Sequence, residues 1–471
     1  MSTASPSAPF GGEIPVIGGG LAGSEAAWQL AERGFRVALH EMRPVRTTPA
    51  HKTDRLAELV CSNTFKSTEL TTAHGLLKAE MRLLGSLVLW AADEARVPGG
   101  SALTVDRAVF AELVHARLGA HPNVRVVRGE RADVPSPGIV ATGPLTSDAL
   151  AAALGARLGT ESLAFYDAIA PVLAAESVDT AVAFRASRWG RETMAGAGEF
   201  GAAEGAYLNC PMTRDEYEAF VDALVSADRA SAHAFDEVPY FEGCMPVEEI
   251  ARRGRDTLRF GPMKPVGLVD PRTGRRPWAV AQLRMEDRAG RMWNMVGFQT
   301  RLRYPEQQRV FRLIPGLANA EFLRFGSIHR NSYVNAPAAL LPHLALRDAP
   351  ATLVAGQLTG VEGYTESTAT GLLAAVNLAR LLRGDAPALP PTTTMLGALY
   401  RYLREADPRH FQPMNANFGL LDDLDEPVRD KLAKRERFAE RALRDFAAWR
   451  DAVLAEPARD PAAGAAAAAA A

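Results

Sequence analysis

The sequence is short of cysteine and of long apolar runs. Its three cysteines, Cys61, Cys210 and Cys244, cannot form a disulfide framework, and no Cys-x-x-Cys pair or Cys/His cluster has the spacing of a zinc site. No run of about 18 apolar residues predicts a membrane span. Residues 1–12 lack the basic and apolar segments of a secretory signal. We therefore expect a cytoplasmic protein with no metal site and no membrane partner.

Net charge is also small, but the charges are unevenly distributed. The 471 residues carry a formal charge of −2. Residues 251–330 contain 17 lysines and arginines against 6 aspartates and glutamates, whereas the remainder contains 36 basic and 49 acidic residues. Aromatic residues are interleaved in this basic segment: Phe260, Trp278, Trp293, Phe298, Tyr304 and Phe311. The pattern fits a polyanionic partner, and equally a solvated arginine-rich surface that pairs with acidic faces elsewhere.

The N-terminal region contains a strand, a glycine turn, a helix and a second strand in close succession. An apolar run ends in Gly18-x-Gly20-x-x-Gly23, helix-forming residues follow to Arg33, and a second apolar run ends at Glu41. Gly18 permits the tight turn, Gly20 lets the backbone approach a pyrophosphate, and Gly23 lets the helix pack close to the sheet. A carboxylate at Glu41 suits an unphosphorylated ribose, as in FAD or NAD. The pattern predicts a dinucleotide site formed by Gly18, Gly19, Gly20, Leu21, Ala22, Gly23 and Glu41.

A second unit of the same kind lies late in the chain. Residues 351–355 read as a strand, residues 356–364 as a glycine-rich turn, and residues 366–382 as a helix. A short strand at 138–140 ends in Ala141-Thr142-Gly143, which resembles a strand end of FAD proteins of the glutathione-reductase type. We expect the following residues to complete the cofactor site: Thr142, Gly143, Gly356, Gly360, Glu362, Gly363 and Tyr364.

The composition, 47% hydrophobic and 23% charged, is that of a globular protein with two or three domains. We predict an α/β protein with a glutathione-reductase-like Rossmann FAD-binding domain, an inserted α+β domain and a helical C-terminal segment. The FAD-binding domain would comprise residues 1–150 and 336–385. The basic insert, facing tRNA or another substrate, would comprise residues 151–335. A helical segment at 386–460 and a low-complexity tail at 461–471 would follow.

Several blocks resemble the folate- and FAD-dependent tRNA (uracil-5-)-methyltransferases. The blocks run from residue 14 to about residue 380, and their order and spread make the match specific. They are Gly18 to Ala27, His40-Glu41-Met42-Arg43-Pro44, Cys61-Ser62-Asn63, Phe241-Glu242-Gly243-Cys244-Met245-Pro246, Arg259 to Pro265, Asn294 to Thr300, His329-Arg330-Asn331 and Gly360 to Ser367. A related flavoenzyme family that modifies the wobble uridine of tRNA has a longer helical C-terminus, which this chain lacks.

The resemblance implies an enzyme that makes 5-methyluridine in the T loop of tRNA, at position 54. The carbon would come from 5,10-methylenetetrahydrofolate, and the reducing equivalents from NADH or NADPH through FAD. The basic, aromatic-bearing insert would bind the RNA. We expect a monomer with no stable protein partner. Two other readings remain: an FAD-dependent oxidoreductase of a small substrate, and a flavin-containing, non-catalytic tRNA-binding protein.

The same resemblance implies two catalytic cysteines. Uracil carbon 5 becomes nucleophilic when a thiolate adds to carbon 6, and a thiolate forms readily near neutral pH and leaves afterwards. We assign Cys244 as the nucleophile and Cys61 as the second thiol, which removes the carbon-5 proton; the two roles are exchangeable. Cys210 reads as a packing residue. His329 and Arg330 are candidates for holding folate or RNA.

Overall fold

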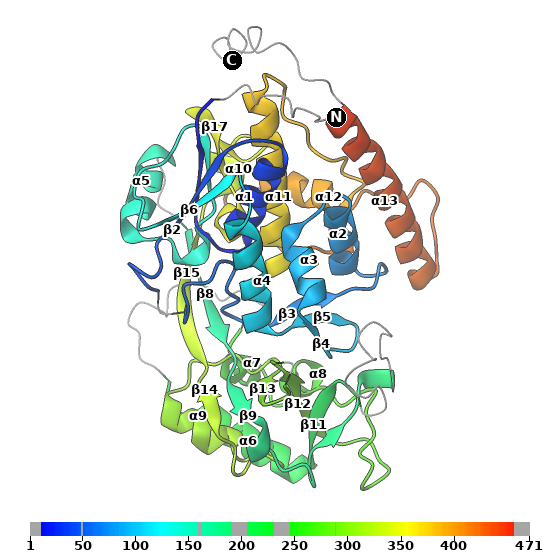
Figure 1. Cartoon of the computed structure of the whole chain (residues 1–471). Coiled ribbons are helices and arrows are strands. Elements are labelled where there is room, and N and C mark those ends of the chain that lie inside the picture. Colours follow the sequence, from blue (N-terminus) through cyan, green and yellow to red (C-terminus); the bar gives the residue numbers. More distant parts are fainter. Residues whose placement is uncertain are drawn as a thin grey trace.

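The computed structural model describes residues 11–48, 50–158, 163–190, 205–229, 245–287 and 289–455. Two lobes lie one above the other in Figure 1, and each has its own hydrophobic core. The upper lobe contains the first and last thirds of the chain, and the lower lobe contains the middle. Among the helices of the described residues, none has the length and apolar character that crossing a bilayer requires.

A six-stranded sheet forms the centre of the upper lobe, in the order β16-β17-β7-β1-β2-β6. All neighbours pair in parallel except β16 and β17. The strands are β1 (Ile14–Ile17), β2 (Val37–Glu41), β6 (Val124–Arg128), β7 (Gly138–Val140), β16 (Ala345–Leu346) and β17 (Ala349–Val354). The sheet therefore joins two parts of the sequence that lie on either side of the middle segment, as expected for a split dinucleotide-binding domain.

Pro15 lies inside the central strand β1 without breaking the ladder to β2. The N–H groups of Ile14 and Gly18 donate to carbonyls of the β2 side, at Arg36 and His40, in the alternation of a parallel pair. The nitrogen of Pro15 therefore faces β7, whose pairing with β1 begins only at Val16. Proline has no N–H to donate, and its nitrogen lies where β1 does not yet pair with β7.

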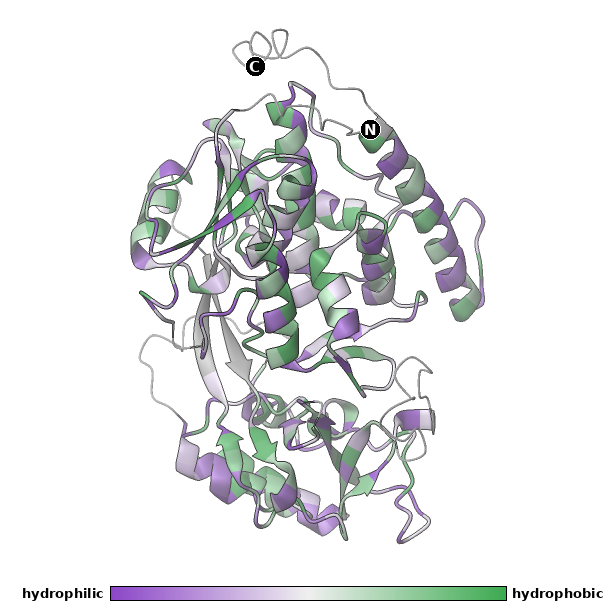
Figure 2. Cartoon of the chain, viewed as in Figure 1, coloured by the Kyte–Doolittle hydropathy of each residue, from purple (hydrophilic) through white to green (hydrophobic). Residues whose placement is uncertain are grey.

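Helices cover the parallel sheet and extend from it. Figure 2 shows hydrophilic residues along much of the C-terminal helix, which lies at the edge of the lobe. The helices are α1 (Leu21–Glu32), α2 (Ala73–Arg82), α3 (Leu87–Glu94), α4 (Arg107–Gly119), α5 (Asp148–Leu158), α10 (Ala336–Ala339), α11 (Tyr364–Leu382), α12 (Met395–Glu405) and α13 (Lys431–Ala455), with 3-10 turns η1 (Gly143–Leu145), η5 (Gly356–Thr359) and η6 (Phe418–Leu420). A small antiparallel sheet has the order β3-β5-β4, with β3 (Thr64–Ser67), β4 (Arg96–Val97) and β5 (Ala102–Val105).

The segment from His74 to Leu89, which has continuous helical spacing, forms two helices rather than one. The chain turns at Gly85, where φ is +68°, a conformation that favours glycine. The side chain of Ser86 then accepts a hydrogen bond from the N–H of Leu89 and caps α3. Local capping chemistry therefore overrides the apolar periodicity here.

The lower lobe is built on a six-stranded antiparallel sheet in the order β10-β11-β12-β13-β9-β14. Its strands are β9 (Val172–Ala174), β10 (Phe184–Arg185), β11 (Tyr207–Met212), β12 (Ala279–Met285), β13 (Met292–Met295) and β14 (Phe322–Arg324). Its helices are α6 (Arg214–Ser226), α7 (Val247–Arg252), α8 (Thr257–Phe260) and α9 (Tyr304–Phe311), with turns η2 (Ala175–Ser177) and η3 (Arg188–Gly190). The chain enters this lobe through β8 (Leu163–Ile169) and leaves through β15 (Ser327–Tyr333), which pair with each other between the lobes (Figure 1).

The first and last parts of the upper lobe meet where α1 packs against α11. A Cβ atom added to Gly371, in the middle of α11, would lie 2.2 Å from the carbonyl oxygen of Ala22 in α1. The helices therefore approach to a distance that only glycine allows. This contact fixes the N-termini of both helices at the same end of the sheet.

We expect Gly371→Ala to lower the free energy of unfolding by about 1–3 kcal/mol, because the added methyl group forces the two helices apart. Gly119→Ala is the matched control: Gly119 is the last residue of α4, and a Cβ there meets nothing within 4 Å. The control should be neutral or stabilising by up to about 1 kcal/mol. Urea titration followed by circular dichroism measures both. A Gly371→Ala midpoint equal to that of the parent would contradict the close contact.

Candidate active site between the two lobes

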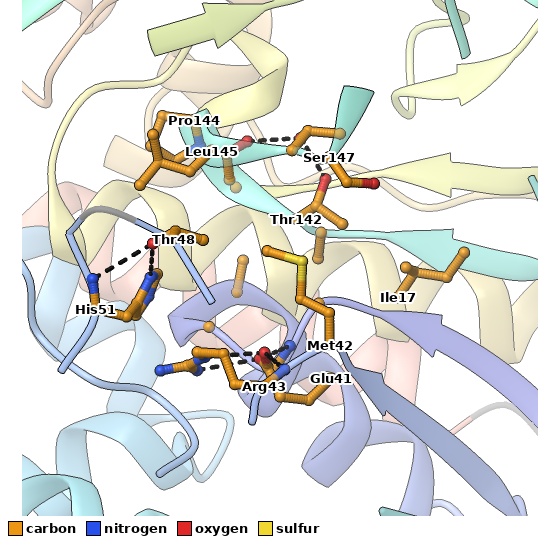
Figure 3. A pocket seen from close by; sticks show the side chains of 18 of the residues that line it. Ile17, Glu41, Met42, Arg43, Thr48, His51, Thr142, Pro144, Leu145 and Ser147 are labelled. Carbon is orange, nitrogen blue, oxygen red and sulfur yellow. Dashed lines mark hydrogen bonds and ion pairs between the residues drawn. The ribbon is translucent and has the colours of Figure 1, made fainter. Parts of the chain in front are cut away.

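A cavity opens at the carboxyl ends of the parallel strands, where dinucleotides bind in this class of sheet. It encloses about 1060 Å³ of empty space, its mouth included. Its walls come from both parts of the upper lobe. They are residues 17–22, 40–43, 129–131 and 141–147, with Thr48, His51, Glu58, Val60, Leu150, Gly356, Gln357, Tyr364 and Ser367. Figure 3 shows Glu41 and Arg43 on one side and Thr142 and Ser147 on another.

The first glycine turn has the geometry that a pyrophosphate requires. Gly18 has φ of +103°, and a Cβ there would lie 2.5 Å from the carbonyl oxygen of Ala141. A Cβ on Gly23 would lie 1.8 Å from the carbonyl oxygen of Gly18, so Gly23 allows α1 to pack against the turn. Gly20 lines the cavity, and a Cβ there would point into open space. The unpaired N–H groups at the start of α1 therefore face a space from which side chains are excluded.

Glu41 lines the cavity, but its carboxylate already has partners. Oε1 accepts hydrogen bonds from the backbone N–H and Nε of Arg43, and Oε2 accepts from Nη2 of Arg43 and the N–H of Gly19. Burial opposes ionisation, but the hydrogen bonds and charge of Arg43 outweigh it and hold the pKa of Glu41 below its usual value. A ribose hydroxyl would share these oxygens with Arg43 or displace it. Glu41 also fixes the glycine turn to the end of β2.

The second glycine turn contributes only some of its predicted residues to the cavity. Gly356 and Tyr364 line it, as do Thr142 and Gly143. Gly360, Glu362 and Gly363 are not among the described lining residues. Gly360 has φ of +87°, and a Cβ there would lie 2.4 Å from the ring of Phe411, so its role is conformational. The carboxylate of Glu362 accepts a hydrogen bond from Gln357, which does line the cavity.

Cys61 lies beside this cavity in a loop that Tyr364 anchors. The phenol oxygen of Tyr364 accepts hydrogen bonds from the backbone N–H groups of Cys61 (2.9 Å) and Ser62 (3.0 Å), which are about 300 residues away in sequence. Burial, with a smaller contribution from Cys61, raises the pKa of Tyr364 above its usual value, so the phenol stays protonated. One residue therefore forms part of the cavity wall and positions the thiol-bearing loop.

Asn63 and Arg107 join this loop to the lower lobe. The buried amide of Asn63 donates to the carbonyls of Val105 and Met285 and accepts from Nε of Arg284. Arg107 donates through Nε and Nη2 to the two carboxylate oxygens of Glu286, at 2.7 and 2.9 Å, and also to the carbonyl of Cys61. Cys61 is thus held at the junction of the two lobes, beside the end of β12.

These partners could not be predicted from the sequence. Gln282, Arg284 and Glu286 alternate with apolar residues at the end of β12. They are all buried, with 8%, 6% and 4% of their surface exposed. Such alternation normally predicts a strand whose polar face is exposed to solvent, so the burial of this face could not be predicted from the pattern. That face is the one turned toward the Cys61 loop.

Of the other two cysteines, the structure describes Cys210 but not Cys244. Cys210 is fully buried in β11, and burial raises the pKa of its thiol to about 12, which fits the predicted packing role. Cys244 lies outside the described residues, directly before Met245 and the start of α7. His329 and Arg330 lie in β15, and only their backbone is described. In the described part of the chain, no group of three or more potential ligands could hold a metal ion.

The basic segment divides into paired and unpaired arginines. The arginines that form ion pairs include Arg252 with Glu249, Arg255 with Asp222 and Arg272 with Asp270. Arg275 and Arg276 are exposed, and no carboxylate among the described residues contacts them. Part of the positive charge is therefore neutralised locally, and part remains available to an anionic partner.

The aromatic residues of this segment also divide. Trp293, Phe298 and Phe311 belong to the core of the lower lobe. Phe260 and Tyr304 are exposed, by 78% and 56%. The guanidinium of Arg259 covers the ring of Trp278, 3.5 Å from its centroid. Tyr304 already stacks on Phe325, with ring centroids 4.6 Å apart, so Phe260 is the ring more available to a nucleobase.

We expect Gly20→Val to abolish or strongly weaken binding of FAD, because a branched side chain would occupy the space that the pyrophosphate needs. Flavin absorbance of the purified protein measures this. Gly11→Val is the matched control, since a Cβ at Gly11 also meets nothing within 4 Å and Gly11 does not line the cavity. If the Gly20 variant retains as much flavin as the control, the turn does not bind the phosphates.

Comparison with known proteins agrees with this architecture. The family model described as glucose inhibited division protein A matches residues 13–386. The structure of GidA from Aquifex aeolicus superposes with a TM-score of 0.65 at 16% identity, covering 93% of this chain and 73% of that one. At this identity the similarity shows the shared fold, a FAD-binding Rossmann-type domain with additional domains.

Relatives of closer sequence carry a more specific name. Methylenetetrahydrofolate–tRNA-(uracil-5-)-methyltransferase TrmFO of Geobacter sulfurreducens is 55% identical over 440 residues, which is 93% of this chain and 99% of the relative. The protein of the same name from Geotalea uraniireducens is 54% identical over 439 residues, 93% of this chain and 98% of the relative. The chain therefore belongs to the family described as glucose inhibited division protein A and to the methylenetetrahydrofolate–tRNA-(uracil-5-)-methyltransferases.

Proposed function

We propose that this chain methylates carbon 5 of a uridine in tRNA, with methylenetetrahydrofolate as the carbon donor and FAD as the redox cofactor. The observation that carries the proposal is the position of Cys61, beside the dinucleotide cavity, where Tyr364 both lines the cavity and holds the thiol-bearing loop. A thiol next to a cofactor cavity is what this reaction requires. The names of the relatives give the same reaction.

The finer details extend this proposal. The target is the T-loop uridine at position 54, and NADH or NADPH reduces the cofactor. Cys244 is the nucleophile, and Cys61 accepts the carbon-5 proton. The position of Cys61 supports its assignment; that of Cys244 rests on the family motif Phe241-Glu242-Gly243-Cys244-Met245-Pro246, which lies outside the described residues except for Met245 and Pro246.

The chain's own residues would perform two tasks. One thiolate forms a bond to uracil carbon 6 and moves the electron pair of the carbon 5–carbon 6 double bond to carbon 5, which attacks the one-carbon unit. The other thiolate removes the carbon-5 proton, and the electron pair of that carbon–hydrogen bond expels the nitrogen that carried the one-carbon unit. Hydride addition to the resulting methylene re-forms the carbon 5–carbon 6 double bond and expels the first thiolate. FAD, when bound in its reduced form, would supply this hydride equivalent, which turns the methylene into a methyl group. Gly18, Gly19, Gly20 and the start of α1 would hold its pyrophosphate.

The two alternative functions are less well supported. An oxidoreductase of a small substrate has no need of a segment with a large excess of arginine, and no relative reported above carries such a name. A non-catalytic tRNA-binding protein would not need a thiol loop held by Tyr364, Arg107 and Asn63 against the cofactor cavity. Formation of 5-methyluridine in unmodified tRNA, given methylenetetrahydrofolate and NAD(P)H, distinguishes methylation from both.

We expect Cys61→Ala and Cys244→Ala each to abolish 5-methyluridine formation while flavin binding survives, because no other group replaces the missing thiol. Cys210→Ala is the control: it should stay active and lose about 1–2 kcal/mol of stability, as its buried side chain only packs. Nucleoside analysis of treated tRNA measures the activity. Full activity in the Cys61/Cys244 double variant would exclude the thiolate mechanism.

A substrate with 5-fluorouridine at the target position should trap the nucleophile covalently, since fluorine cannot leave as a proton does. Mass spectrometry of the trapped peptide then identifies the attacking residue. We expect the peptide that contains Cys244. A peptide with Cys61 would exchange the two roles.

The unpaired arginines should contact the RNA more strongly than the paired ones. We expect Arg275→Gln with Arg276→Gln to weaken tRNA binding and to reduce the slope of log affinity against log salt concentration by about 0.7–0.9 for each lost phosphate contact. Arg255→Gln with Arg272→Gln should have a smaller effect, because carboxylates already neutralise those side chains. Binding titrations at several salt concentrations measure this. An unchanged slope in the Arg275/Arg276 variant would indicate a merely solvated surface.

A further inference from the structure

Arg324 lies at the same junction of the lobes as Cys61 but has no role in the contacts described so far. It is the last residue of β14, the edge strand of the lower sheet. The groups near enough to act on its charge include Arg107, Glu286, Cys61 and Tyr364, which are the groups around the thiol-bearing loop. Burial, followed by repulsion from Arg107, lowers the pKa of Arg324 to about 10, so the side chain remains charged at neutral pH.

One edge of the Arg324 guanidinium is buried and has no partner in the described part of the chain. Its Nε and Nη2 atoms form no hydrogen bond to any described residue. These two atoms form the edge that binds two oxygens of one oxyanion side by side. Arg107 uses the same edge, at 2.7 and 2.9 Å, to bind both oxygens of Glu286. A buried charged donor without an acceptor is costly, so this edge is suited to an oxyanion that reaches it once the groups covering it move aside.

The neighbouring residues that the structure describes do not supply that oxyanion. Both oxygens of Glu286 already accept hydrogen bonds from Arg107. Arg284, buried on β12, donates from its Nε to the neutral amide oxygen of Asn63. The cluster therefore contains three arginines, Arg107, Arg284 and Arg324, and one carboxylate, Glu286. Its excess positive charge lies beside the thiol-bearing loop.

We propose that the Nε/Nη2 edge of Arg324 binds a backbone phosphate of the RNA next to the target uridine and so places the uracil against the thiols. This inference rests on the proposed function. The reaction brings two kinds of oxyanion to the site, RNA phosphates and the carboxylates of the folate. Arg324 belongs to the lower lobe, whose segment 251–330 carries the large excess of basic residues, and this favours the RNA.

The test compares Arg324→Gln and Arg324→Lys with Arg309→Gln, an arginine of the same lobe that pairs with Glu306 on the surface. We expect Arg324→Gln to weaken binding of a T-loop RNA hairpin about tenfold or more and to lower its salt slope by about 0.7–0.9. Arg324→Lys should keep the salt slope of the parent but bind the hairpin more weakly than the parent does. Lysine provides the positive charge but cannot donate two parallel hydrogen bonds to one phosphate. KM for methylenetetrahydrofolate should not change. Arg309→Gln should bind like the parent.

A second arm uses the parent enzyme, so that it does not depend on the folding of a variant. Hairpins in which single phosphates around the target uridine are replaced by neutral methylphosphonates are titrated against the parent and against Arg324→Gln. One position should weaken binding to the parent to the level of Arg324→Gln, and should have little further effect on that variant. If every neutral linkage binds the parent as well as the natural hairpin does, the inference is wrong.

Two other results would also overturn it. A raised KM for folate with unchanged RNA binding in Arg324→Gln would assign the oxyanion to the folate carboxylate. A change only in the pH dependence of Cys61 alkylation would assign Arg324 to the thiolate. Failure of the proposed function is separate: the parent enzyme would then form no 5-methyluridine, whatever Arg324 does.

Discussion

The bidentate contact between Arg107 and Glu286 is the interaction on which the site depends. Arg107 begins α4 of the upper lobe, and Glu286 follows β12 of the lower lobe, 179 residues later in the chain. Through Nη2, the same guanidinium also holds the carbonyl of Cys61. One partly buried side chain therefore connects the two lobes and holds the thiol-bearing loop. Asn63 makes a second connection, through hydrogen bonds to Val105 and Met285. The paired geometry matters because a buried charge is tolerated only when its donors are satisfied.

The first wall of the cavity could be predicted from the sequence because its determinants are local. Gly18, Gly20 and Gly23 act within one turn and the first residues of one helix, and their spacing carries the information. The fold class followed from the same pattern and its return near Gly356. The interlobe contacts could not be predicted in this way, since Arg107 has no partner within its own element and Glu286 is an ordinary residue in sequence. The charge count of the basic segment could not show which arginines are free to bind RNA. Arg255 and Arg275 look alike in the sequence, and only the structure shows that Asp222 pairs with Arg255.

Glu41 shows how a motif residue can have more than one physical task. Its place after β2 predicts a ribose ligand, and its position in the cavity agrees with that prediction. Its four hydrogen bonds, however, come from Arg43 and Gly19, so the carboxylate also stabilises the glycine turn itself. A substitution here would therefore change the shape of the phosphate loop as well as any contact with a ribose. Loss of cofactor binding in such a variant would therefore not show whether the loop shape or the ribose contact was lost.

The pairing of β17 with β7 has a consequence for the order in which the protein is made. β7 ends at Val140, and its partner strand begins at Ala349, so the ribosome synthesises the whole lower lobe between them. Until then, an edge of the parallel sheet has unpaired N–H and C=O groups, and the cavity lacks Gly356 and Tyr364. A nascent chain interrupted within the lower lobe therefore has the phosphate loop but an incomplete cofactor site, and its exposed strand edge is open to incorrect pairing with other chains.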